Sequence, residues 1–232
     1  MTAGFQLKNE GRDDYQIDGM YRSMVLSRHI QVVTDTDRGG DEGIYQGPDL
    51  VNASYVIVPV VAGEIVAWRC DAYCVVTSVS GGTALILSGG PVGTMIDLYF
   101  FLPITTSNAT AGAQVFRDDG TLVFCASKKP LVFAGVTNGD GVFSYTPGRS
   151  YAAICITAYM KMMVTVFGAQ PAVSALYVEM MGMVKAVGGG VQIDKRMTFS
   201  YFAANAGQAV YFPVRGETPH GNVFAVIDVT GY

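Results

Sequence analysis

The feature that most constrains the fold is the interruption of every apolar run by glycine, proline or small polar residues. The runs are short, as at 55–61 and 83–87, and they are rich in β-branched and aromatic residues. Short apolar runs bounded by turn-forming residues at this spacing are typical of sandwiches and barrels. None approaches the roughly 18 apolar residues of a membrane span. The sequence therefore predicts an all-β fold of predominantly antiparallel strands, with no membrane insertion.

The opening stretch predicts a β-hairpin that leads into a longer strand. Residues 4–8 alternate between apolar and polar, residues 9–14 are polar and turn-forming, and residues 15–17 supply the returning strand. Residues 21–33 then alternate well enough for a long strand. A similar order returns at 112–133, with Asp119-Gly120 at the turn.

This internal similarity indicates two related β-sandwich-like halves. The expected organisation is an N-terminal β domain at 1–102 that opens with a hairpin, a linker at 103–111, and a C-terminal β-sandwich domain at 112–232. In the second half, residues 172–185 fit either a helix or a strand, and we favour a strand. The methionines at 160–183 fit either an adaptable binding surface or ordinary core filling, and we favour the core.

Composition predicts a protein that hides much of its surface in partners. Half of the residues are hydrophobic and 15% are charged, against roughly 25% charged in an average soluble domain. A homo-oligomer or a symmetric assembly is expected. The net charge of −4, with Lys and Arg scattered, argues against a nucleic-acid partner. Residues 1–20 lack the pattern of a signal peptide, so we expect synthesis and first folding in the cytosol.

The cysteines, at positions 70, 74, 125 and 155, predict buried free thiols. They lack the spacing of a zinc site. If Cys70 and Cys74 belong to one strand they face the same side, which would place a disulfide badly. The acidic residues of the loop at 35–42 superficially resemble a calcium loop, but strand-like flanks and Arg38 favour a solvated turn. No metal ligand or cofactor is expected.

Candidate catalytic residues are few, and we expect no enzyme. The chain has two histidines, His29 in a strand and His220 in a loop, without a recognisable nucleophile beside either. A glycosidase needs only two carboxylates, and Asp97 and Glu179 are the acids that lie inside apolar runs. A glycan-cleaving enzyme therefore stays open as the third and least favoured class.

The opening sequence from Gly4-Phe5-Gln6-Leu7 through Gln16-Ile17-Asp18-Gly19 to Met24-Val25-Leu26 resembles the start of small tail proteins of long-tailed, siphovirus-type bacteriophages. The segment 112–133 looks like the second part of that pattern. The resemblance implies a structural virion protein without enzymatic activity at the tail tip or fibre base, made in the host cytoplasm and bound to other tail proteins. The expected partner contacts are in the opening stretch: Phe5, Leu7, Tyr15, Ile17 and Tyr21.

The alternative hypothesis is a carbohydrate-binding β-sandwich that mediates adsorption to host-surface glycans. In that case Trp68, or exposed tyrosines, would stack on sugar rings.

Overall fold

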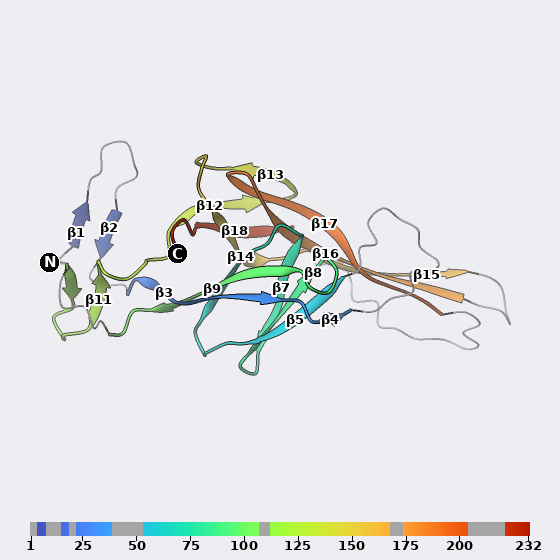
Figure 1. The fold of residues 1–232 in the computed structure, drawn as a ribbon, viewed down its shortest axis with the longest axis horizontal. Coiled ribbons are helices and arrows are strands. Elements are labelled where there is room, and N and C mark those ends of the chain that lie inside the picture. Colours follow the sequence, from blue (N-terminus) through green and yellow to red (C-terminus); the bar gives the residue numbers. More distant parts are fainter. Residues whose placement is uncertain are drawn as a thin grey trace.

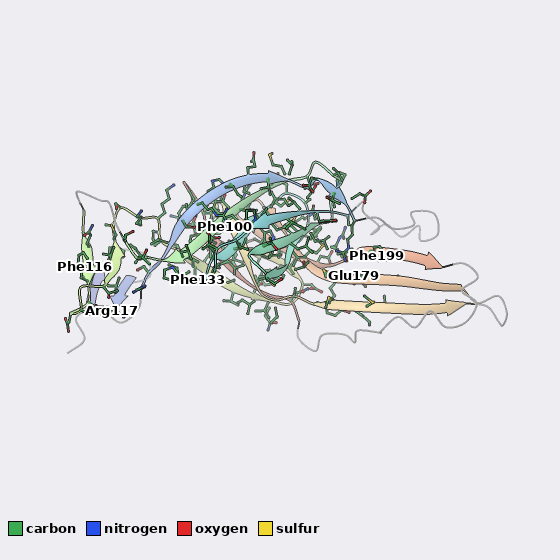
Figure 2. The ribbon with its side chains drawn as sticks, turned by 90° about the horizontal axis from the view of Figure 1, so that it is seen from below. Phe100, Phe116, Arg117, Phe133, Glu179 and Phe199 are labelled. Carbon is green, nitrogen blue, oxygen red and sulfur yellow. The ribbon has the colours of Figure 1, made fainter. Side chains whose placement is uncertain are left out.

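The computed structural model describes residues 4–7, 15–18, 22–38, 53–106, 112–167, 174–203 and 221–232. Within these ranges every regular element is a β-strand, and the paired strands are antiparallel. The prediction of an all-β antiparallel fold is therefore confirmed. Two open sheets pack face to face, with small hairpins at one end and a projecting arm at the other (Figures 1 and 2). No described element is a helix able to cross a membrane.

The first sheet has six strands in the order β12-β18-β14-β6-β9-β3. In that order, their bounds are Phe133–Asn138, Val223–Asp228, Tyr151–Thr157, Ile65–Arg69, Met95–Pro103 and Met24–Val33. The second sheet has the order β13-β17-β16-β7-β8-β5-β4, and β15 pairs with β16 off this path. Their bounds are Gly141–Ser144, Gly190–Ala203, Ser174–Val187, Cys74–Ser80, Thr83–Ser88, Ser54–Pro59 and Thr36–Asp37, with β15 at Met160–Phe167.

Both sheets combine strands from the two sides of the expected linker, which corrects the predicted division at 103–111. In the first sheet β6 pairs with β14, through Trp68 and Ala153. In the second, β7 pairs with β16, through Cys74 and Val184. The apolar faces of both halves therefore close over one shared core instead of forming separate sandwich halves. Local patterning identifies most of the strands but not their partners, because pairing across the sheet is non-local.

Both predicted hairpins form, and they lie at the same end of the molecule (Figures 1 and 2). The first joins β1 (Gly4–Leu7) to β2 (Tyr15–Asp18), and the second joins β10 (Gln114–Phe116) to β11 (Leu122–Cys125). At the second turn Gly120 has a φ of 81°, which glycine adopts without a steric penalty. The Ser23 N–H donates to the Val123 carbonyl at 2.8 Å, so β11 is tied to the chain that enters β3.

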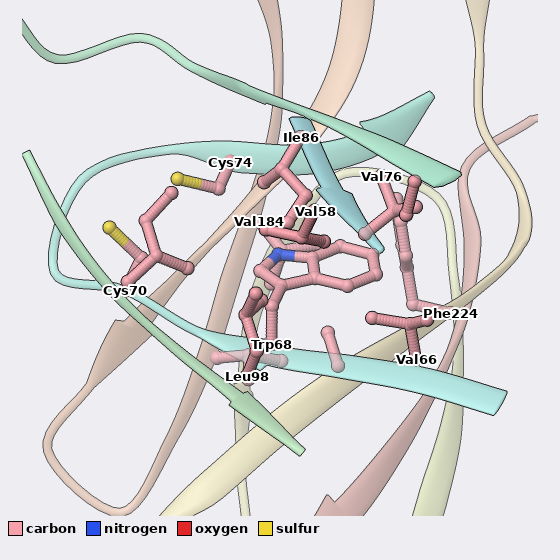
Figure 3. Packing of buried hydrophobic residues seen from close by; sticks show 14 of the residues in the cluster. Val58, Val66, Trp68, Cys70, Cys74, Val76, Ile86, Leu98, Val184 and Phe224 are labelled. Atoms are coloured by element: carbon pink, nitrogen blue, oxygen red, sulfur yellow. The ribbon is translucent and has the colours of Figure 1, made fainter. Parts of the chain in front are cut away.

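The core between the two sheets is centred on Trp68, the only tryptophan (Figure 3). Its indole packs edge-on against Phe224, with ring centroids 6.1 Å apart. Along β9 the side chains alternate: Ile96, Leu98 and Phe100 enter the core, while Asp97, Tyr99 and Phe101 face the other side. This alternation is the expected period of two of a strand between a core and a second surface.

A partly buried ion pair lies beside a bulge in β3, at the edge of this core. The register of β3 against β9 shifts between Leu26 and Arg28, and the Arg28 guanidinium then lies 3.7 Å from the centre of the Phe100 ring. Arg28 Nη2 donates to Glu64 Oε2 at 2.9 Å and to the Pro59 carbonyl at 2.6 Å. Burial opposes ionisation of Glu64, but the hydrogen bonds led by that from Arg28 lower its pKa.

The cysteine pair at 70 and 74 lies differently from the prediction. A turn separates β6 of the first sheet from β7 of the second. Cys70 therefore follows a strand of one sheet, and Cys74 begins a strand of the other. Their side chains lie close together (Figure 3). The argument against a disulfide assumed a single strand, and that assumption is wrong. The Cys74 thiol donates to the Cys70 sulfur, which lowers the pKa of Cys70, while burial raises the pKa of Cys74. All four cysteines are free thiols.

Candidate functional site

The first candidate surface is the arm, which we define as residues 162–167 of β15, residues 174–179 of β16 and residues 199–203 of β17. A register shift between Glu179 and Met180 marks the point where it leaves the sandwich, and it then projects beyond both large sheets (Figure 2). Among the described strands, these residues pair only within the arm. The arm therefore continues strands of the second sheet past their pairing with its other strands, and Val178 and Glu179 at its base are buried.

The strand registers place apolar residue types in adjacent rows of the arm. One row is Met163–Val178–Ser200, and the next is Val164–Tyr177–Tyr201. Successive residues of a strand belong to opposite faces of a sheet. Both faces of the arm consequently carry apolar residues, which is the pattern of a sheet buried on both sides.

An ion pair anchors the base of the arm to the loop that follows β4. Arg38 Nη2 donates to both carboxylate oxygens of Glu179, at 2.7 and 2.8 Å, and the Thr198 hydroxyl donates to Oε1 at 3.2 Å. Both charged side chains are largely buried. The loop at 35–42 was interpreted as a solvated turn, but its Arg38 has this structural role; residues 39–42 lie outside the described ranges.

Of the six methionines at 160–183, only Met183 is buried in the core, and the others are partly exposed: Met160, Met162, Met163, Met180 and Met181. Core filling is therefore confirmed at Met183 alone.

The second candidate surface is the outer face of the six-stranded sheet, opposite the shared core. Its β12, β18 and β14 side is apolar, with cross-strand rows through Phe133, Ile227 and Ala152 and through Val136, Ala225 and Ile154. Phe133 and Val136 are 63% and 64% exposed. Towards β9 the C-terminal Tyr232 covers this face, with its ring 6.2 Å from that of Phe101.

On the β6, β9 and β3 side of the same face lies a polar cluster around Asp97. Gln31 Nε2 donates to Asp97 Oδ1 at 3.1 Å, His29 Nε2 lies 3.5 Å from the same oxygen, and Arg69 Nη1 lies 3.6 Å from Oδ2. The His29 ring stacks on Tyr99, with centroids 4.4 Å apart and planes 5° from parallel. Burial, and the Asp97 charge after it, raise the pKa of Tyr99. The cluster is a connected set of donors and acceptors on the sheet surface.

Arg69 also belongs to a cleft of about 210 Å³ at the end of the sandwich. The walls come from three turns that are far apart in the chain: 69–71 after β6, 149–151 at the start of β14, and 186–189 at the β16–β17 turn. The Ala186 N–H donates to the Cys70 carbonyl at 2.7 Å, which joins two of these walls. Sequence reasoning missed the cleft, because its polar residues are scattered and belong to no motif.

Arg149 on the cleft wall is paired with Asp228, the last residue of β18. Burial opposes ionisation of Asp228, but hydrogen bonds from Thr230 and Arg149 lower its pKa. A carboxyl group whose pKa is lower in the folded state stabilises the fold above its unfolded pKa, near 3.8. That contribution disappears as the pH falls through the folded pKa.

We therefore expect Arg149→Gln to lower the free energy of unfolding by about 1–2 kcal/mol at neutral pH, and by progressively less as the pH falls below 3.8. Urea unfolding between pH 7 and about pH 3 measures this difference. Lys128→Gln, which removes the same charge at an exposed position, is the control and should show no such trend. An Arg149→Gln deficit that does not change with pH would contradict the assignment.

The structure brings few of the predicted site residues together. Trp68 is 1% exposed within the core, so the prediction that it stacks on sugar is wrong; its apolar ring is buried between the sheets. The two carboxylates of the glycosidase hypothesis are in different sheets, Asp97 on β9 and Glu179 on β16, and each has its own cationic partner. His220 and Tyr21 lie outside the described ranges.

The other expected partner contacts belong to the first hairpin, where Phe5 pairs with Ile17 and Leu7 with Tyr15 along the backbone. Their role in partner binding stays a prediction. Among the described residues, no three or more His, Cys, Asp or Glu side chains are grouped to hold a metal ion.

The fold and these surfaces define an all-β sandwich protein with a projecting arm. Comparison of the chain with protein-family models, curated proteins and solved structures finds no match.

Proposed function

We propose that this chain is a structural protein of a bacteriophage tail, positioned at the tail tip or fibre base, and that it joins its neighbours through the arm. The observation that carries the assembly role is the three-stranded arm, which projects beyond the sandwich with apolar residue types in adjacent rows (Figure 2). Burial of apolar surface is the main favourable term in protein association. Such a layer is stabilised when neighbouring subunits cover both of its faces.

Two further observations support the assembly role. The outer face of the six-stranded sheet exposes Phe133, Val136 and Ile156, the last at 54%. Three large apolar side chains exposed on one face of a sheet agree with an interaction surface. The tail itself is proposed from the resemblance of the opening stretch and of residues 112–133, and the pair of hairpins at one end of the molecule agrees with that repeated pattern (Figure 1).

The experiment shortens the arm without touching the sandwich. Met163 and Val178 are direct cross-strand partners, so residues 164–177 can be replaced by an Asn-Gly turn that closes a shorter hairpin. We expect the full-length chain, when labelled, to mark the tail tip of assembled particles and the shortened chain to be absent from them. Unchanged emission from the buried Trp68 verifies that the sandwich still folds. Label away from the tail tip contradicts the location, and normal incorporation of the shortened chain contradicts the role of the arm.

A further inference from the structure

We propose that the cleft between the turns at 69–71, 149–151 and 186–189 is a binding site for a neutral sugar, held through its hydroxyl groups. This site is separate from the arm and does not depend on the tail assignment.

The cleft contains polar groups that the protein leaves open to a ligand. The nearest carboxylate oxygens to the Arg69 guanidinium are Asp97 Oδ2 at 3.6 Å and Asp71 Oδ1 at 3.9 Å. Both separations exceed the length of a hydrogen bond, so Arg69 keeps N–H donors for a ligand. The Asp71 side chain is 91% exposed and offers acceptors, and the exposed Ser150 adds a hydroxyl that can donate and accept.

The charge balance favours a neutral ligand over an anion. Both arginines of the cleft have carboxylates beside them: Asp71 and Asp97 at Arg69, and Asp228 at Arg149. The surroundings therefore carry no excess of positive charge, and the whole chain has a net charge of −4. A phosphate or sulfate would add negative charge beside carboxylates that already balance the charge of the two arginines. Adjacent sugar hydroxyls, in contrast, can donate to Asp71 and accept from Arg69.

The walls are fixed before any ligand arrives. The Ala186 N–H donates to the Cys70 carbonyl, the Tyr145 N–H donates to the Gly189 carbonyl at 2.8 Å, and the Val229 N–H donates to the Ser150 carbonyl at 2.9 Å. A pre-formed site loses little conformational entropy on binding. Its volume of about 210 Å³ is below the roughly 300–1,000 Å³ of sites for drug-sized ligands. It therefore suits one sugar ring at a time, with a millimolar dissociation constant expected for so small a ligand.

Gly188 offers a way to close the cleft. A Cβ atom added there meets no atom within 4 Å, and its φ is not in the left-handed region. Gly221 has the same open surroundings and an equally permissive backbone, but it does not line the cleft. Gly188→Leu should fill the cleft without strain, and Gly221→Leu is its matched control.

The experiment is an amide NMR titration of the full chain with the methyl glycosides of glucose, galactose, mannose, rhamnose and N-acetylglucosamine, and separately with inorganic phosphate. We expect at least one glycoside to shift the amides of residues 69–71 and 186–189. Gly188→Leu should abolish these shifts and Gly221→Leu should keep them. Arg69→Gln should weaken binding about tenfold, while Lys128→Gln should leave it unchanged.

Three results would overturn the proposal. They are the absence of shifts with every glycoside, equal binding by Gly188→Leu and the parent chain, and tighter binding of phosphate than of any glycoside. The last would make the cleft an anion site.

Discussion

Trp68→Ala is expected to cause the largest loss of stability of any single substitution in the described core. The indole is 1% exposed and packs between the two sheets, with Phe224 at its edge and Cys70 and Cys74 nearby (Figure 3). Truncating a buried tryptophan to alanine costs about 3–5 kcal/mol, through lost transfer free energy and the cavity left behind. A whole domain has a free energy of unfolding of about 5–15 kcal/mol. Urea unfolding followed by far-ultraviolet circular dichroism measures the loss.

Trp68→Phe is the matched control. It keeps an aromatic ring in the core and removes the indole N–H, which is buried without a hydrogen-bond partner among the described residues. Its cost should be clearly smaller than that of the alanine variant, because the remaining cavity is smaller and no polar group is left unpaired. An alanine variant within about 1 kcal/mol of the parent chain would be inconsistent with Trp68 at the centre of the core.

Glu179→Ala is expected to produce the second large loss, at the base of the arm. The Glu179 carboxylate accepts two hydrogen bonds from Arg38 and one from Thr198. Removing one partner of a buried ion pair leaves the other charge uncompensated and costs about 3–5 kcal/mol. Since Arg38 comes from the loop after β4, we also expect faster amide hydrogen exchange in that loop and at the base of β16, measured by mass spectrometry.

The double variant Arg38→Met with Glu179→Leu separates the ion pair from the packing around it. Replacing both charges by apolar side chains of similar size is often neutral or stabilising, so this variant should recover most of the stability lost by Glu179→Ala. If it is as unstable as the single variant, the loss comes from disturbed packing and the ion pair contributes little.

Structure that depends on neighbours in the chain was predictable. The hairpins of β1 with β2 and of β10 with β11 form where polar turns separate short alternating runs. The apolar run at 151–167 divides into β14 and β15, but these two strands belong to different sheets and do not pair with each other. Cys70 and Cys74 do not share a strand, because the turn at 71–73 separates β6 from β7. The residues on both sides of that turn enter the same core, so their apolar character alone does not reveal the turn.

The candidate surfaces depend on contacts that no local pattern encodes. Arg38 and Glu179 are 141 positions apart, and the cleft joins turns near residues 69, 149 and 188. Neither set has a characteristic spacing. The burial of Trp68 could not be predicted for a related reason. An aromatic residue in an alternating strand has the same sequence pattern whether it faces the core or the outer surface of a sheet.

The sequence by itself determined the class of the fold, the position of most strands and the presence of the two hairpins. These follow from periodicity and turn chemistry, which act over a few residues. Only the tertiary structure decided that the two halves share one core, that β15, β16 and β17 extend as an arm, and that Arg69 and Arg149 line one cleft. The physical reason is that strand pairing and burial are set by which apolar faces meet across the whole chain.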